Sequence, residues 1–185
     1  MPSSALPEAG PFVSQPVLRR LEVVDLPFLQ AMFVNTICWR PDLPRRSLEE
    51  LLAEPELSKY IVGWGRRGDA GVVAVSTSGD RLGAAWYRLF SDADHGYGFV
   101  SSETPELGIA TAETHRGRGL GTELLRGLIQ VAREEGHSAL SLSVEEDNVP
   151  AVKLYARLAF QRVERIDNSW TMLLRLKPPA GVTET

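Results

Sequence analysis

The chain contains only one cysteine among its 185 residues, Cys38, and only three histidines. A single cysteine excludes an internal disulfide framework, so we expect a small, partly buried thiol in a reducing compartment, with the cytoplasm as the location. The histidines, His95, His115 and His137, are scattered and lack the spacing of metal ligands. We therefore expect no metal site.

Long apolar runs are also missing, since no stretch approaches the roughly 18–20 residues that span a bilayer. Residues 1–15 have neither a basic start nor an apolar segment, which argues against a secretory signal. A net charge of −4 argues against contacts with a phosphate backbone, which need a basic face. We expect neither a membrane nor a nucleic acid as a partner.

The remaining composition, 43% hydrophobic and 24% charged, is that of an ordinary globular protein. Residues 1–16 are rich in Pro, Ser and Ala and predict a disordered leader, and residues 177–185 predict a flexible tail. No repeat or long linker interrupts residues 17–176, which predict a single domain.

Hydrophobic periodicity and turn residues predict a mixed α/β fold in which helices cover a sheet. Strands are expected over 17–23, 71–77, 83–89, 106–112, 140–144, 161–166 and 170–176, with a short irregular strand near Tyr97 and Phe99. Helices are expected over 25–36, 48–53, 149–158 and from residue 120 to a stop at Gly136.

The sharpest motif is Arg116-Gly117-Arg118-Gly119-Leu120-Gly121, between a predicted strand and a predicted helix. Glycine lets the backbone bend tightly and an anion approach its N–H groups, and a helix amino terminus favours negative charge. The loop therefore predicts a cradle for a pyrophosphate. It lacks the lysine of a Walker loop, and Thr122 stands where a Rossmann loop needs its third glycine.

The same six residues resemble the signature of the GNAT superfamily of N-acetyltransferases, Gln/Arg-x-x-Gly-x-Gly/Ala. Asn148, Tyr155, Leu158 and Phe160 resemble its second conserved block, and the resemblance covers residues 106–163. It implies the GNAT, or acyl-CoA N-acyltransferase, fold: a central mixed, mostly antiparallel sheet flanked by helices. It also implies acetyl transfer from acetyl-CoA to a primary amine of a small molecule or peptide, by direct attack and without a covalent enzyme intermediate, in a monomer or homodimer.

The resemblance assigns the cofactor-binding residues. The backbone of Ile109, Ala110 and Thr111 would pair with the pantetheine arm. The backbone amides of residues 117–121, including Leu120, would hold the pyrophosphate together with Thr122. Arg118, with Arg116, could screen its charge, and the alternative is a solvated arginine pair. Gly108 in the same strand suits either a close backbone approach or simple packing.

Asn148 and Tyr155 lie seven residues apart and so face one side of a short helix. By resemblance Asn148 binds the pantetheine and the Tyr155 hydroxyl serves the thiolate, whereas their structural alternatives are a helix N-cap and core packing. Glu106, at the head of the cofactor-binding strand, is the expected general base; it could instead be a solvated edge acid. Relatives with a glutamate on the following strand differ here, because this chain has Ser143.

A second departure is Ala159, where the family has glycine. If that position takes φ > 0, alanine costs on the order of 1 kcal/mol, so the helix could end differently. Candidate walls of the acceptor pocket are aromatic or basic side chains, each of which could equally belong to the core: Trp39, Arg40, Trp64, Tyr87, Tyr97 and Phe99.

Two other functions fit the loop. A GNAT-like domain could bind an acyl-CoA as a sensor or interaction module without turning it over, and a nucleotide-binding protein could use the same loop for ATP. Stabilisation by acetyl-CoA and CoA but not by ATP would favour the acetyltransferase.

Overall fold

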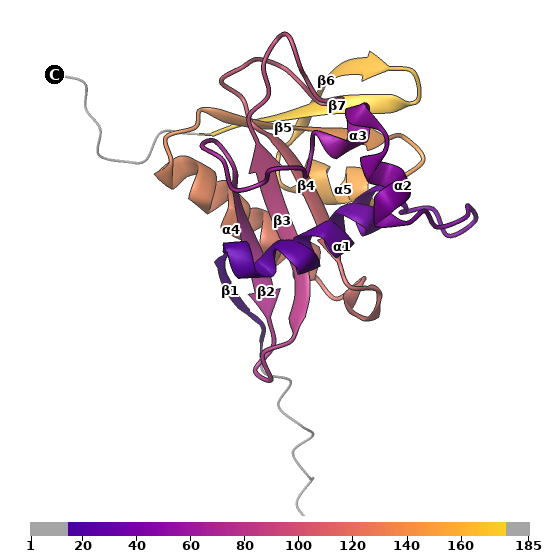
Figure 1. The fold of residues 1–185 in the computed structure, drawn as a ribbon. Coiled ribbons are helices and arrows are strands. Elements are labelled where there is room, and N and C mark those ends of the chain that lie inside the picture. Colours follow the sequence, from indigo (N-terminus) through magenta and orange to yellow (C-terminus); the bar gives the residue numbers. More distant parts are fainter. Residues whose placement is uncertain (1–14, 177–185) are drawn as a thin grey trace, which may run out of the picture.

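The computed structural model describes residues 15–176; the predicted tail and nearly all of the predicted leader lie outside this range. Its centre is a seven-stranded sheet with the order β1-β2-β3-β4-β5-β7-β6 (Figure 1). Neighbouring strands are antiparallel except β4 and β5, which are parallel. The strands are β1 (Val17–Arg20), β2 (Ala70–Val75), β3 (Arg81–Arg88), β4 (Glu106–Thr111), β5 (Ala139–Glu145), β6 (Gln161–Ile166) and β7 (Ser169–Arg175).

Helices cover both faces of this sheet (Figure 1). On one face α4 (Leu120–Glu134) and α5 (Val149–Arg157) pack over the larger hydrophobic core. On the other face α1 (Leu26–Ile37), α2 (Leu48–Leu52) and α3 (Pro55–Ser58) enclose a second core with side chains of β3. Short 3₁₀ turns at Val23–Asp25 and Glu113–His115 precede α1 and α4. The sheet therefore separates two layers, and each layer meets one side of β4 and β5.

Helix starts follow from local chemistry. At α2 the Ser47 hydroxyl accepts from the Glu50 amide at 3.1 Å while the Glu50 carboxylate accepts from the Ser47 amide at 2.6 Å, which is the capping box that the sequence predicts. The α4 helix begins after Gly119, and its leucines at positions 120, 124, 125 and 128 are buried on one side.

The feature that opens a site is the splay between β4 and β5. These two strands share a single pairing, Glu106 with Ser141, and beyond it they diverge. Leu140, Leu142 and Val144 of β5 pack in the core beneath α4. Side chains alternate along a strand, so Ser143 and Glu145 point to the opposite face, where α1 lies.

The observed fold is the mixed, mostly antiparallel α/β fold that the sequence predicts. Three details were wrong. The first strand ends at Arg20 rather than near residue 23, α3 was not predicted, and residues 97–99 form turns and loop instead of a strand. Cys38 is a half-buried free thiol whose sulfur accepts from the Arg46 amide at 3.4 Å.

Candidate active site

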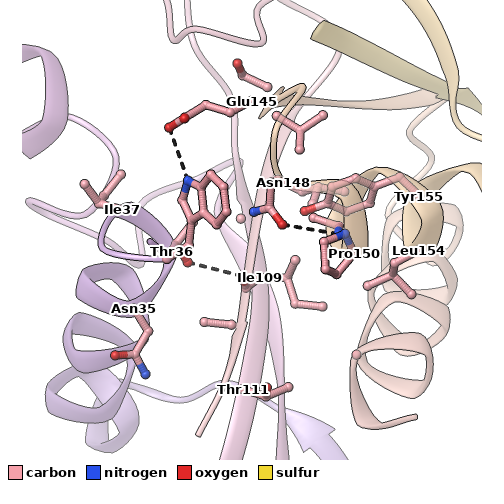
Figure 2. Close-up of a pocket in the computed structure, with 18 of the residues that line it drawn as sticks. Asn35, Thr36, Ile37, Ile109, Thr111, Glu145, Asn148, Pro150, Leu154 and Tyr155 are labelled. Carbon is pink, nitrogen blue, oxygen red and sulfur yellow. Dashed lines mark hydrogen bonds between the residues drawn. The ribbon is translucent and has the colours of Figure 1, made fainter. Parts of the chain in front are cut away.

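A cavity of about 950 Å³ opens where β4 and β5 diverge. Figure 2 shows Asn35, Thr36 and Ile37 of α1 on one side of β4, and residues of α5 on the other side. The two faces of the sheet thus meet in one cavity, with the exposed edge of β4 between them.

The β4 backbone offers alternate residues to this cavity. The Ala112 amide donates to Leu82 at 2.8 Å, and by alternation the backbone groups of Ala110 also point to β3 while those of Ile109 and Thr111 point into the splay. All three predicted pantetheine-binding residues line the cavity, Ala110 included. The Ile109 carbonyl already accepts from the Thr36 hydroxyl at 3.2 Å, whereas its N–H faces the opening.

Gly108 has a packing role. A Cβ at this position would lie 2.8 Å from the ring of Trp86 on β3, so the indole occupies the space that a side chain would need. The structure therefore supports the packing alternative for this glycine, and Trp86 fills the α1 side of the strand.

The glycine loop presents free amides at the start of α4. Gly117 has φ +73° and Gly119 has φ +84°, conformations that L side chains rarely adopt, and nothing lies within 4 Å of a Cβ built on either. Within residues 15–176, the amides from Gly117 to Gly121 have no hydrogen-bond partner. The Thr122 amide differs, because it donates to the Gly119 carbonyl at 2.9 Å. Five unpaired donors at a helix amino terminus form an anion site in physical terms.

The side chains of the predicted cradle divide into two groups. Arg116 and Thr122 line the cavity. Arg118 and Leu120 do not line it: Arg118 is exposed, and the Leu120 side chain is buried in the core, which leaves only the backbone amide of Leu120 for the cradle.

Asn148 and Tyr155 both line the cavity from α5 (Figure 2). The Asn148 carbonyl oxygen accepts from the Ala151 amide at 3.3 Å, so this residue is the N-cap of α5, as its structural alternative predicts. The Tyr155 ring is 7% exposed and packs edge-on against Phe160. The hydrogen bonds of the described residues include none to its hydroxyl, and burial raises its pKa.

Glu106 is a buried acid, not a solvated edge residue, with only 4% of its surface exposed. One carboxylate oxygen accepts from the Tyr60 hydroxyl at 2.9 Å and from the Gly98 amide at 2.9 Å. The other oxygen is buried without a partner in the described part of the chain. Burial raises the pKa of the Glu106 carboxyl to about 7, against the lowering effect of these two hydrogen bonds.

The environment of Glu106 comes from residues that sequence analysis missed. A Cβ at Gly96 would lie 2.2 Å from the unpartnered oxygen, and one at Gly98 would lie 2.5 Å from the Ser143 amide nitrogen. The loop therefore packs directly on Glu106 and β5 because it has glycine at both positions. The glycines of residues 91–102 were the one available signal; nothing in the sequence pointed to Tyr60.

Of the six candidate pocket walls, Trp39 and Tyr97 line the cavity, and the other four do not. The Trp39 indole nitrogen donates to the Glu145 carboxylate at 3.2 Å, a bond that links the segment after α1 to the end of β5. Figure 2 draws this bond as the dashed line at Glu145. Beside it, Arg40 stacks on the Trp39 ring at 5.4 Å and forms an ion pair with Asp147 at 3.1 Å.

Two further observations concern residues 15–176 alone. They contain no group of three or more His, Cys, Asp or Glu side chains that could hold a metal ion. None of their helices is long and apolar enough to cross a membrane.

Comparison with known proteins identifies several acetyltransferases as similar. The chain is 44% identical over 68 residues to a mycothiol acetyltransferase of Corynebacterium aurimucosum, covering 35% of this chain and 22% of that protein. It is 32% identical over 96 residues to the L-methionine sulfoximine/L-methionine sulfone acetyltransferase of Pseudomonas aeruginosa, covering 52% and 53%. The matched region thus spans about half or less of these relatives.

The fold is shared with a GNAT superfamily phosphinothricin acetyltransferase from Sinorhizobium meliloti, solved in complex with acetyl-CoA. The TM-score is 0.63 at 19% identity, over 91% of this chain and 96% of that chain. A model of the acetyltransferase (GNAT) family matches residues 35–160, which contain the glycine loop, β4, β5 and α5. This match covers more than half of the chain, and the protein therefore belongs to the GNAT acetyltransferase family.

Proposed function

We propose that the protein transfers the acetyl group of acetyl-CoA to a primary amine by direct attack, without a covalent enzyme intermediate. The observation that carries the proposal is that one cavity brings together the edge of β4, a buried acid and an unpaired phenol. In the similar phosphinothricin acetyltransferase, acetyl-CoA is bound on the same fold. A small molecule is the simplest acceptor, as the names of the mycothiol and methionine sulfoximine relatives indicate.

The loop and the strand edge suit the donor. The five unpaired amides from Gly117 to Gly121 would hold the pyrophosphate, with Arg116 beside them in the cavity. The pantetheine arm would lie in the splay, along the edge of Ile109 and Thr111, with Asn148 and Tyr155 on the α5 side. The Ile109 N–H, which faces this opening, would stabilise the negative charge on the thioester oxygen as the amine attacks.

Glu106 would act as the base. A protonated amine with pKa about 10.4 loses about 4–5 kcal/mol of reactivity at pH 7 unless a base removes a proton. A carboxyl with a pKa of about 7 is ionised in half of the molecules at neutral pH, which suits a general base, with a water in the cavity as carrier. The amine nitrogen forms the new bond to the carbonyl carbon, and its proton passes to Glu106.

Tyr155 would complete the reaction. The carbon–sulfur bond breaks with its electron pair on sulfur, and the thiolate takes a hydrogen bond or a proton from the phenol. Burial keeps the phenol protonated, as a donor requires, and the hydrogen bonds of the described residues include none to its hydroxyl.

The test combines binding with turnover. Thermal unfolding should shift upwards with acetyl-CoA and with CoA, and not with ATP, because ATP lacks the pantetheine arm that the β4 edge would hold. Amines should then trigger thiol release from acetyl-CoA. Binding of acetyl-CoA without thiol release, over a broad panel of amines, would instead indicate a non-catalytic sensor. Stabilisation by ATP alone would exclude both functions.

A further inference from the structure

The face of the cavity opposite α4 and α5 carries carboxylates. This acceptor face consists of the α1 end with Trp39, and of the side chains of Glu106 on β4 and Ser143 and Glu145 on β5. Glu145 is half-buried, and the one hydrogen bond of its side chain within the described chain is the bond from Trp39; its carboxylate has no ion-pair partner there. Asp167, in the turn between β6 and β7, also lines the cavity without a partner in that range.

The cations of the cavity are elsewhere. In the described chain, the basic side chains that line it are His115, Arg116 and Arg157. The first two belong to the segment that leads into α4, and the third ends α5, so all three lie on elements of the other face. Arg40, which follows Trp39 in the chain, does not line the cavity and is already paired with Asp147. The acceptor face therefore holds uncompensated negative charge.

Given the proposed acetyl transfer, on which this inference rests, we infer that the acceptor carries a second cationic group, which Glu145 binds beside the Trp39 indole. The Trp39 N–H holds one oxygen of Glu145 and leaves the other for an ammonium. An amino-acid acceptor would instead bring a carboxylate, for which this face has no free cation.

Strand geometry places the two glutamates at opposite ends of the acceptor face. Glu106 pairs with Ser141, and Glu145 lies four residues further along β5, which corresponds to about 13 Å along the strand. The partnerless, buried carboxylate oxygen of Glu106 marks one end. An amine that reacts between these ends, near Ile109, can reach Glu145 with a second ammonium on a short carbon chain. A short diamine is thus the acceptor class that fits.

Three acceptors with the same four-carbon chain test this: diaminobutane, butylamine and γ-aminobutyrate. Their second group is cationic, absent or anionic. The wild-type protein should acetylate diaminobutane with a kcat/KM at least about tenfold above that of butylamine, because only diaminobutane can form a charge-assisted hydrogen bond with Glu145. γ-Aminobutyrate should be the poorest acceptor, because its carboxylate is repelled by Glu145.

The variant Glu145→Gln keeps an oxygen for the Trp39 hydrogen bond and removes only the charge. It should raise the KM for diaminobutane about tenfold or more, leave the KM for butylamine within about twofold, and leave the KM for acetyl-CoA unchanged. Glu164→Gln, on the fully exposed strand β6, is the matched control and should change none of these values. Equal kcat/KM for diaminobutane and butylamine in the wild type, or equal losses with all three acceptors in Glu145→Gln, would overturn the inference.

Calorimetric titration of diaminobutane into CoA-saturated protein gives a readout that needs no turnover. Binding weakened about tenfold by Glu145→Gln supports the inference even if no amine is acetylated, in which case only the proposed function fails. Turnover of butylamine and diaminobutane without preference refutes the inference and leaves the proposed function standing. Absence of diaminobutane binding to wild type also refutes the inference.

Discussion

Replacement of Glu106 by glutamine should change both the pH dependence of the rate and the pH dependence of the protein's stability. With a pKa of about 7, the carboxyl is about 10% ionised at pH 6 and about 90% ionised at pH 8. If Glu106 is the base, kcat/KM for the acceptor should rise about tenfold between these pH values on account of this group alone. In Glu106→Gln the break near pH 7 should vanish and the rate at pH 8 should fall about 100-fold or more.

The stability of the protein should show the opposite dependence. The pKa of Glu106 is raised from 4.5 in water to about 7 in the fold, so the unfolded chain releases this proton first as the pH rises. The folded state then binds more protons between these values, and the free energy of unfolding should fall across that window, by about 3 kcal/mol at most. Glu106→Gln has no charge to bury, and its stability should lack this decline.

The assay pairs pH–rate profiles with urea unfolding at pH 5 and pH 8, on wild type, Glu106→Gln and the surface control Glu164→Gln. One acceptor amine is used throughout, so its own ionisation contributes equally to every protein. A break near pH 7 that persists in Glu106→Gln would refute the base assignment. A wild type equally stable at both pH values, relative to Glu106→Gln, would refute the raised pKa itself.

Three further changes test other parts of the site and the fold. Tyr155→Phe should lower kcat, measured by steady-state kinetics, about tenfold or more, and should leave the Kd of acetyl-CoA, measured by calorimetry, within about twofold. Equal losses in kcat and in affinity would indicate that Tyr155 only packs. Gly119→Ala places a Cβ at φ +84° in the anion site and should weaken CoA binding severalfold. The control Gly79→Ala, at φ +91° in the β2–β3 turn, should lower the free energy of unfolding by a similar amount without changing the affinity for CoA. An equal loss of CoA affinity in both variants would contradict the cradle. Asp25 is fully buried between Arg19 and Arg81, at 2.6 Å from each, and the hydrogen bonds from these partners hold its pKa well below the usual range. Its stabilisation is therefore complete above about pH 4 and is lost progressively as the pH falls below that value, so Asp25→Asn should lower the melting temperature at pH 7 and lower it by less the further the pH falls below 4.

Local signals in the sequence predicted what depends on local geometry. The glycine loop needs positive φ at Gly117 and Gly119, and only glycine offers that conformation without strain, so the motif was visible from composition and spacing. The seven-residue interval between Asn148 and Tyr155 likewise placed both on the cavity side of one helix. Their roles toward the pantetheine and the thiolate stay predictions.

Ala159 shows where a local rule gave the wrong expectation. The residue takes φ +67° although it is not glycine, and α5 ends there as a glycine would allow, with the Phe160 amide donating to the Tyr155 carbonyl at 3.1 Å. Burial of Phe160 in the main core offsets the backbone strain of about 1 kcal/mol. Tertiary packing, which the sequence does not display, decides this helix end.

The state of Glu106 was equally hidden. Its hydrogen-bond partners, Tyr60 and Gly98, are 46 and 8 residues away in the sequence, and neither belongs to the blocks that resemble the superfamily. The aromatic alternation at Tyr97 and Phe99 predicted a strand because aromatic residues favour strands. The structure has a loop there instead, because Gly96 and Gly98 let the backbone approach the carboxylate and β5 more closely than any side chain would permit.

The splay of β4 from β5 gives these separate observations a common geometry. A sheet normally keeps its two faces apart, and here the single pairing of Glu106 with Ser141 holds the strands together at one end while the rest of the interval stays open. The donor groups, from Gly117 to Tyr155, belong to the α4 and α5 face, and the carboxylates of Glu106 and Glu145 belong to the α1 face. Two substrates approaching from opposite faces would compete for no side chain, so a change in a residue that only binds, such as Gly119 on one face or Glu145 on the other, should alter the KM of one substrate alone. Groups proposed to act on the reacting atoms, namely Tyr155, Glu106 and the Ile109 amide, serve both substrates, and changes there should appear in kcat.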